Sequence, residues 1–177
     1  MDKEKAIAKL SGKLDDESIE ASKFLSHLGS IKEVEALSLL LNHKETENRF
    51  LAAKTLEDME ANQIALPRLW EAIENPENSE IKGDLMSTLQ GYDISLYYVN
   101  IFKLYLFGAF KVTRTAENLL DFQDFDITAR VIKKAKKQWA HYSNNVKQDD
   151  AYTLKKLEVE ERLKDLQEFV DSQESQS

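Results

Sequence analysis

The chain has no cysteine, and its 177 residues include only five glycines, two prolines and three histidines. Without cysteine it can form neither disulfides nor zinc–thiolate sites, and it offers no thiol nucleophile. His27, His43 and His141 lie far apart in the sequence, so we expect no metal site and no cofactor. The scarcity of glycine and proline favours helices joined by short connections and predicts an all-α protein.

The sequence also lacks an apolar run long enough to span a membrane. The most hydrophobic stretch, residues 94–110, is shorter than the ~20 apolar residues that a bilayer needs, and Asn100 and Lys103 interrupt it. We expect a buried helix here, whose aromatic residues between Tyr97 and Phe107 either pack in the core or form an exposed patch. The N-terminus alternates charged and apolar residues, so it predicts no signal peptide and favours a cytoplasmic protein.

Negative charge predominates, with a net charge of −8, but it is unevenly distributed. Residues 1–126 carry 14 basic and 23 acidic side chains, whereas residues 127–147 carry six basic and no acidic ones. The overall sign disfavours binding to nucleic acid, because that requires many phosphates to be neutralised by lysine and arginine. We expect the basic helix around residues 130–137 to pair with acidic residues of the last helix, between Glu158 and Glu168.

A helix–turn–helix unit at residues 66–93 recurs along the chain. Apolar residues follow helical spacing up to Ile73, Asn75-Pro76 forms a turn, and a second stripe runs to Leu89 with Gly91 as the expected C-cap. A shift of 33 residues places Leu89 on Leu56, and a shift of 31 places Leu56 on Leu25. Because one helical pair cannot bury both of its stripes, the pairs are expected to stack as a solenoid.

The segment NRFLAAKTLEDM, in which Arg49 precedes small residues and a leucine, resembles a HEAT-type repeat, and EIKGDLMSTLQGYD is similar to part of small bacterial HEAT-like proteins. The resemblance covers roughly residues 4–125. It implies a right-handed α-α solenoid of helical pairs over residues 1–126. We expect a C-terminal helical pair at 127–171 to cap it, followed by a disordered tail at 172–177. Some small bacterial HEAT-like proteins are thought to be immunity partners of toxins.

The sequence favours binding over catalysis. It contains no Gly-rich phosphate loop, no Ser elbow and no HExxH motif, so we expect no enzymatic activity and no catalytic residues. Stacked second helices form a concave face that suits protein recognition, and the acidic residues on these helices predict a basic protein partner. The candidate partner-binding residues are Glu47, Arg49, Glu80, Asp84, Glu117 and Asp121. Arg49 has a second interpretation, a structural ladder to a carboxylate of the next repeat.

Two alternatives stay open at the level of sequence. HEAT-like folds include bilin lyases and alkylpurine DNA glycosylases, which keep aromatic and acidic residues in a concave cleft. The glycosylases also line that cleft with basic residues, whereas the second helices here offer acidic ones, so we expect no nucleic-acid partner. Among binding proteins, an immunity protein that masks a cationic toxin and a regulatory adaptor are both compatible with the pattern. We expect a monomer or a weak homo-oligomer and no membrane partner.

Overall fold

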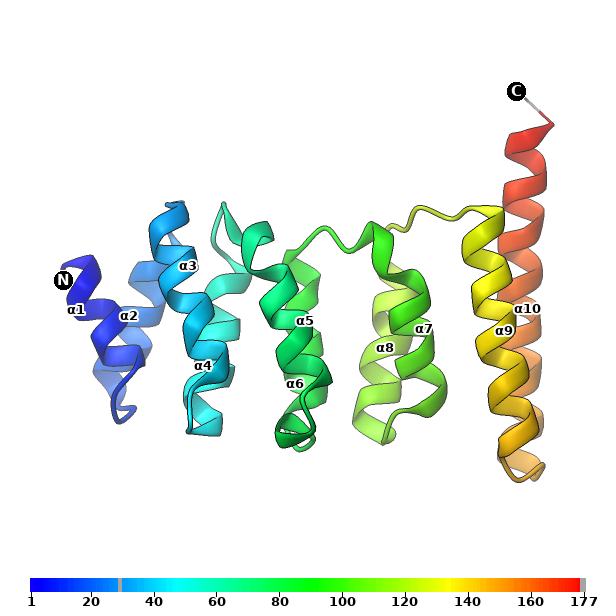
Figure 1. Ribbon diagram of the computed structural model, residues 1–177, viewed down its shortest axis with the longest axis horizontal. Helices are drawn as coiled ribbons and strands as arrows, with labels where there is room; N and C mark the ends of the chain where they lie inside the picture. The colour runs from blue at the N-terminus through cyan, green and yellow to red at the C-terminus, as the bar shows by residue number, and fades with distance from the viewer. Residues whose placement is uncertain (29, 176–177) are drawn as a thin grey trace. The chain divides into compact units, whose positions relative to one another are not determined.

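The computed structural model describes residues 1–28 and 30–175, and it confirms that the protein is all-α (Figure 1). Ten α-helices are found in these residues, and they pack mostly against their neighbours in sequence. The chain divides into two compact units, residues 1–93 (unit 1) and 94–177 (unit 2), which are described separately. Gly29, which we expected to end the second helix, lies outside the described residues, as do residues 176 and 177 of the expected tail.

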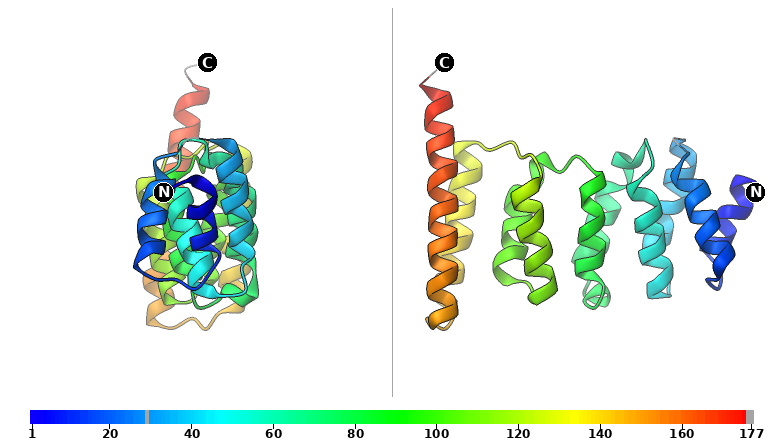
Figure 2. Two further views of the ribbon diagram at one scale, coloured as in Figure 1. Left: turned by 90° about the vertical axis from the view of Figure 1, so that its left-hand side faces the viewer. Right: turned by 180° about the vertical axis from the view of Figure 1, so that it is seen from behind.

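Unit 1 is built from helical pairs joined by short turns. Its α-helices are α1 (Lys3–Leu10), α2 (Asp16–Ser26), α3 (Ile31–Leu39), α4 (Thr46–Glu57), α5 (Leu66–Glu74) and α6 (Lys82–Ser87). Single-turn 3₁₀ helices extend or connect them: η1 (Leu40–Asn42), η2 (Asn62–Ala65), η3 (Pro76–Asn78) and η4 (Thr88–Gly91). Each odd-numbered helix packs on the helix that follows it, α2 also packs on α4, and α4 on α6 (Figure 2).

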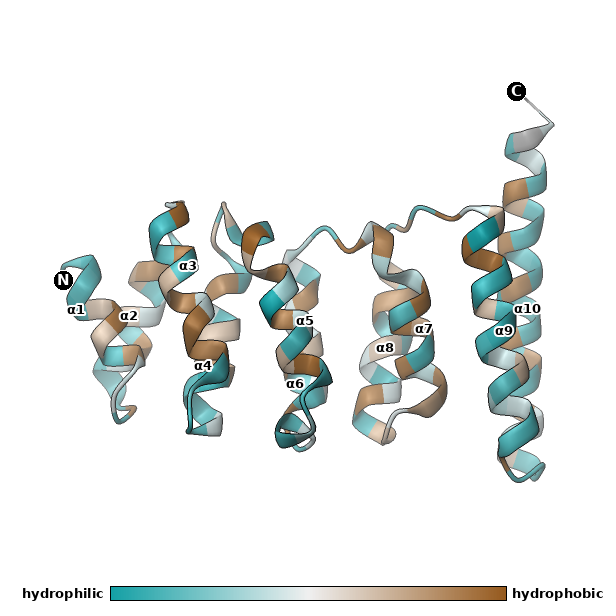
Figure 3. Cartoon of the chain, viewed as in Figure 1, coloured by the Kyte–Doolittle hydropathy of each residue, from teal (hydrophilic) through white to brown (hydrophobic). Residues whose placement is uncertain are grey.

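The core of unit 1 follows the repeat spacing. Leu25, Leu56 and Leu89, which the shifts of 31 and 33 residues align, are all fully buried. Figure 3 shows apolar and polar residues alternating along these helices, as amphipathic helices require. From the helical spacing of Ile19 with Phe24, Leu25 and Leu28 we expect Ile19 to face the core, but it is mostly exposed. Asp15 caps α2 and sets its phase so that Ser18 faces inward in place of Ile19.

Buried asparagines tie neighbouring turns of unit 1 together. The Nδ2 atom of Asn48 donates to the main-chain oxygens of Leu10 at 2.7 Å and Gly12 at 2.8 Å. Asn62 makes the same kind of bond to the oxygen of Gly91, at 2.8 Å. A buried polar group is costly unless it is hydrogen-bonded, and these donors satisfy carbonyls that the ends of helices leave unpaired. The asparagines therefore fix how one pair sits on the next.

Gly91 has a different role from the one we expected. It ends η4, but no glycine in the described residues has a positive φ, so it is not a left-handed C-cap. A Cβ atom at this position would collide with the main-chain oxygen of Glu57. Gly91 is therefore required for the close approach of two chain segments and not for an unusual backbone conformation.

The described residues of unit 2 form four α-helices: α7 (Tyr98–Phe107), α8 (Phe110–Phe122), α9 (Ala129–Asn145) and α10 (Asp150–Glu174). The 3₁₀ helix η5 (Ser95–Tyr97) precedes them. α7 packs on α8 and on α9, and α9 packs on α10. Asp126 is the N-cap that the sequence predicts for α9, but the observed N-cap is Thr128, whose hydroxyl accepts from the main-chain nitrogen of Val131. α10 continues through Glu174, so residues 172–174 of the expected tail are helical.

The apolar stretch 94–110 forms α7 and packs inside unit 2. Tyr98, Phe102 and Tyr105 are buried, as the core interpretation predicted. In the same stretch Leu96 is 79% and Phe107 is 43% exposed, and the two ends of α8 also carry exposed apolar side chains, with Phe110 83% and Phe122 77% exposed. None of the described helices is both long and apolar enough to cross a membrane.

The expected charge pairing between α9 and α10 does not form. Among the described side chains of α9 and α10, no ion pair joins the two helices. Instead, the Nζ atom of Lys136 donates to the side-chain oxygen of Gln167 at 2.9 Å. Ring stacking holds the pair together, with the centroids of Trp139 and Tyr152 5.9 Å apart. The sequence predicted the antiparallel helices but not which side chains join them.

Candidate partner-binding cleft

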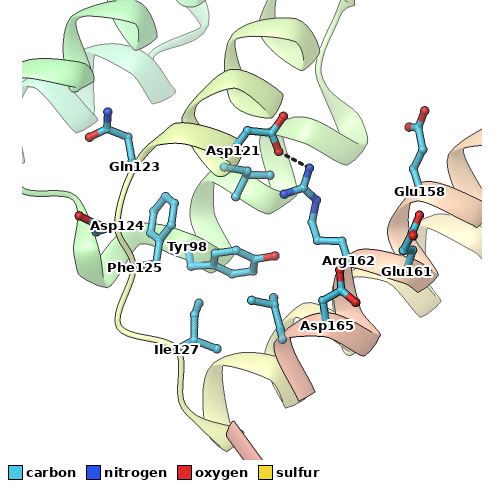
Figure 4. Close-up of a pocket in the computed structure, with 12 residues that line it drawn as sticks. Tyr98, Asp121, Gln123, Asp124, Phe125, Ile127, Glu158, Glu161, Arg162 and Asp165 are labelled. Atoms are coloured by element: carbon cyan, nitrogen blue, oxygen red, sulfur yellow. Dashed lines mark hydrogen bonds and ion pairs between the residues drawn. The ribbon is translucent and has the colours of Figure 1, made fainter. Parts of the chain in front are cut away.

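A cleft of about 520 Å³ opens in unit 2 between the end of α8, the loop 123–127 and α10 (Figure 4). The main-chain nitrogen of Asp126 donates to the oxygen of Ser95 at 3.0 Å, which holds this loop against the segment that leads into α7. The cleft has apolar walls and a charged rim. It is lined by Tyr98, Leu120, Asp121, Gln123, Asp124, Phe125, Ile127, Glu158, Glu161, Arg162, Asp165 and Leu166.

Tyr98 provides a polar atom within the apolar part of the cleft. Its residue surface is only 3% exposed, and its ring packs edge-on against Phe125 with the centroids 5.3 Å apart. The hydroxyl has no hydrogen-bond partner among the described residues, and Figure 4 shows it directed towards Arg162. Burial raises the pKa of Tyr98 to about 12, and the nearby charge of Asp121 adds to this shift while Arg162 opposes it.

Arg162 is the one cation that lines the cleft. Its side chain is 24% exposed, and its Nη2 atom donates to Oδ1 of Asp121 at 2.6 Å. Burial works against the charged form of Arg162, but the hydrogen bond and the charge of Asp121 outweigh it, so the pKa is raised. The pair links the end of α8 to the middle of α10.

A second polar contact lies deeper, between α7 and α10. The Tyr105 hydroxyl donates to Oε2 of Glu158 at 3.0 Å. Lys155 donates from Nζ to the main-chain oxygen of Tyr105 at 3.0 Å and lies 4.3 Å from the centre of its ring. Burial raises the pKa of Tyr105, with the Glu158 hydrogen bond contributing, and burial lowers the pKa of Lys155. These contacts fix the face that α10 presents to the cleft.

The rim of the cleft carries a large excess of negative charge. Five carboxylates line it against the single guanidinium of Arg162. Asp121 is paired with Arg162, and Glu158 accepts from Tyr105. Asp124, Glu161 and Asp165 have no ion-pair or hydrogen-bond partner in the part of the chain that the structure describes. Unpaired carboxylates beside apolar walls, where the effective dielectric is lower than in water, favour a cationic ligand.

The residues proposed from sequence fall into two groups. Asp121 lines the cleft, and Glu117, one turn earlier on α8, forms an ion pair with Arg114 at 2.8 Å. Glu47, Glu80 and Asp84 belong to unit 1: Glu47 and Glu80 are exposed and Asp84 is half-buried in α6. The structure therefore brings Glu117 and Asp121 together on one helix, and it places the other acidic candidates in the other unit.

Arg49 is buried, with 8% of its surface exposed, and holds a turn together. Its Nη1 atom donates to the main-chain oxygens of His43 at 2.7 Å and Lys44 at 3.1 Å, and Nη2 donates to the Thr46 hydroxyl at 2.9 Å. Every one of these partners lies in the turn before α4 or at its start. The side chain thus serves its own helical pair and does not form a ladder to a carboxylate of the next one.

Sequence reasoning missed Tyr98, Lys155, Glu158 and Arg162 as members of one site. The three α10 residues lie at positions i, i+3 and i+7, which places them on one face of a helix. We predicted instead that Glu158 pairs with the basic helix around residues 130–137, and we assigned no role to Lys155 or Arg162. The pattern that could have indicated the site is the charged face of α10, at helical spacing, together with the tyrosine-rich sequence of α7.

The lining residues suit ion binding through side-chain charge and not acid–base chemistry by histidine, since none of them is a histidine. Across the described residues, no three histidine, aspartate or glutamate side chains are grouped so as to hold a metal ion. Comparisons of the chain with protein-family models, curated proteins and solved structures find no match.

Proposed function

We propose that the chain is a non-enzymatic binding module of HEAT-like helical pairs that recognises a basic protein through its acidic surfaces. The observation that carries the proposal is the cleft of unit 2, where five carboxylates face a single guanidinium. Charge complementarity of this kind steers association and selects against partners of the wrong sign. No reactive group is needed for this function.

Contacts at the repeat spacing support the HEAT-like part of the proposal. The hydroxyls of Ser22 on α2 and Thr55 on α4, 33 residues apart, are 2.7 Å from each other. Arg68 on α5 donates to the Ser38 hydroxyl on α3, 30 residues earlier, at 3.3 Å. Both bonds join equivalent helices of successive pairs, which is the contact that a stacked solenoid of helical pairs would make. The proposed solenoid has four pairs, and α9 and α10 form its C-terminal cap.

An immunity protein that masks a cationic toxin in the bacterial cytoplasm is one concrete version of this function. Such a protein needs a preformed acidic surface, fast association and no cofactor. A regulatory adaptor for a basic protein makes the same demands on the surface. The proposed partner-binding residues remain the acidic candidates of both units, with Arg49 reassigned to the scaffold because its Nη1 and Nη2 atoms donate within its own turn.

The test is capture of a basic partner and its dependence on these charges. Wild-type protein and a Glu161→Lys, Asp165→Lys double variant, which changes two exposed carboxylates of the cleft, are immobilised and exposed to native lysate, and the retained proteins are identified and re-expressed. We expect a basic protein whose association rate with the double variant falls and loses much of its salt dependence, while its dissociation rate changes little. A Glu161→Asp, Asp165→Glu variant is the charge-conserving control. Equal association rates and equal salt sensitivity for all three proteins would contradict recognition of the partner through the acidic surface.

A further inference from the structure

We propose that the cleft of unit 2 takes the guanidinium group of one arginine side chain from a basic partner, with the Tyr98 hydroxyl and two unpaired carboxylates as its acceptors. The carboxylates belong to Glu161 and Asp165, and Asp124 adds unpaired negative charge at the rim. The inference rests on the proposed function, because it names the chemical group that the acidic surface recognises. It adds a defined site to a general charge preference.

The first step is the Tyr98 hydroxyl. It is buried at the cleft, its oxygen has no hydrogen-bond partner within the described residues, and it points towards Arg162 (Figure 4). Most buried polar side-chain atoms in proteins are hydrogen-bonded, since an unpaired one costs free energy. A cationic donor that enters the cleft would give this oxygen the partner that the free protein does not supply.

The second step is the arrangement of the carboxylates. Glu161 and Asp165 are one turn apart on α10, and Asp124 lies across the cleft on the loop after α8, with its carboxylate directed away from Tyr98 (Figure 4). Each is exposed and carries no ion pair in the part of the chain that the structure describes. A ligand placed between Glu161 and Asp165 forms charge-assisted hydrogen bonds in more than one direction, which are stronger than neutral ones.

The third step distinguishes arginine from lysine. A guanidinium has five N–H donors in one plane, is less strongly hydrated than an ammonium group and stacks on aromatic rings. The cleft offers several acceptors in different directions, together with the rings of Tyr98 and Phe125. An ammonium group has three donors and a stronger hydration shell, so it satisfies fewer of these acceptors and loses more water.

Arg162 supports the same chemistry from within the chain. Its guanidinium already occupies one side of the cleft, paired with Asp121 at 2.6 Å, so the cleft accommodates this group. A partner arginine would experience repulsion from Arg162 at short range. We therefore expect Arg162 to limit the affinity of the cleft, and its removal by Arg162→Gln to strengthen binding of a guanidinium ligand.

The experiment uses the full chain and two fluorescein-labelled probes, hexa-arginine and hexa-lysine, with fluorescence anisotropy at low and physiological salt. The cleft variant is Asp124→Asn, Glu161→Gln, Asp165→Asn. The matched control in unit 1 is Glu20→Gln, Glu35→Gln, Glu77→Gln, three exposed glutamates outside the candidate partner-binding residues whose replacement removes the same total charge. Circular dichroism and thermal unfolding confirm that each variant folds.

We expect the cleft variant to bind hexa-arginine about tenfold more weakly than wild type and the control about twofold more weakly, because only the cleft variant loses the charge-assisted contacts. Tyr98→Phe should weaken hexa-arginine about threefold to tenfold, the usual range for one lost hydrogen bond, and should leave hexa-lysine nearly unchanged. Arg162→Gln should bind hexa-arginine more tightly than wild type.

Three outcomes would overturn the inference. If hexa-arginine binds but the cleft and control variants lose equal affinity, the cleft is not the site, although an acidic binding surface remains. If hexa-lysine binds as tightly as hexa-arginine and Tyr98→Phe changes neither, the site does not select a guanidinium. If neither probe binds wild type even at low salt, the proposed preference for a basic partner fails together with the site.

Discussion

Two arginines show how differently the two units use similar chemistry. Arg49 in unit 1 is buried and gives its donors to a turn, namely two main-chain oxygens and a threonine hydroxyl. Arg162 in unit 2 is half-buried and pairs with a carboxylate at the edge of a cleft that holds four more. Arg49 supplies the turn with hydrogen bonds that water would otherwise make. Arg162 partly neutralises the negative charge of the carboxylates that line the cleft.

The same difference extends to the other polar groups. In unit 1, buried Asn48 and Asn62 donate to carbonyls of neighbouring turns, so the polar groups complete the scaffold. In unit 2, Tyr105 donates to a carboxylate, and the buried Tyr98 hydroxyl has no partner in the described residues. Unit 1 also contains buried atoms without a partner among the described residues, such as the Tyr92 hydroxyl and Arg49 Nε, so an unpaired group marks a place for a ligand only where it lines a cleft, as Tyr98 does.

The largest effect should come from the core of unit 1. Leu56→Ala and Leu89→Ala should each lower the free energy of unfolding by ~2–5 kcal/mol, because both leucines are fully buried and their removal leaves a cavity. Leu39→Ala is the matched control, since Leu39 is mostly exposed, and it should cost less than about 0.5 kcal/mol. Urea unfolding followed by circular dichroism measures all three. Equal, small losses would mean that the repeat spacing does not define the core.

The same substitution should lower the free energy of unfolding by different amounts at the two arginines. Arg49→Met should cost ~2–3 kcal/mol, because buried acceptors in the turn lose charged donors that nothing replaces. Arg162→Met should cost about 1 kcal/mol or less, since Asp121 is exposed enough to regain water. Urea unfolding of the two variants is the measurement. A larger loss for Arg162→Met than for Arg49→Met would reverse the contrast between scaffold and site.

The smallest effect should appear at alkaline pH. The pKa of Tyr98 is raised from 10.0 to about 12 in the folded protein, so this group stabilises the fold below pH 10, and that contribution is lost as the pH rises towards 12. Tyr98→Phe should be nearly neutral at pH 7, where its hydroxyl has no partner to lose. Between pH 9 and 11 it should lose about 1 kcal/mol less stability than wild type. Parallel pH dependence of the two proteins would contradict the shift.

How far the sequence predicted this structure depends on the kind of interaction. The period of the apolar residues located the helices and the buried Leu25, Leu56 and Leu89, because burial of a stripe depends on local spacing. Asp121 was chosen for its charge and its position on a second helix, and it does line the cleft.

The remainder depended on contacts between distant segments. Tyr98 and Arg162 are 64 residues apart in the sequence. The spacing of apolar residues around each one does not predict that the two lie close together. The pairing expected between α9 and α10 failed because opposite charges on neighbouring helices meet only if their faces align, and ring stacking of Trp139 on Tyr152 determines that alignment instead. Gly91 was assigned to a cap because a glycine after a helix commonly has a positive φ, whereas here it gives space to Glu57.

The account depends most directly on where a cationic side chain binds, and side-chain and backbone NMR of the full chain during a hexa-arginine titration measures this. We predict that chemical-shift changes concentrate in unit 2, on the Tyr98 ring, the Arg162 Nε–H and the backbone of loop 123–127, and saturate with one dissociation constant. Changes spread evenly over the exposed acidic residues of both units, Glu47 and Glu80 included, or no changes at all, would contradict it.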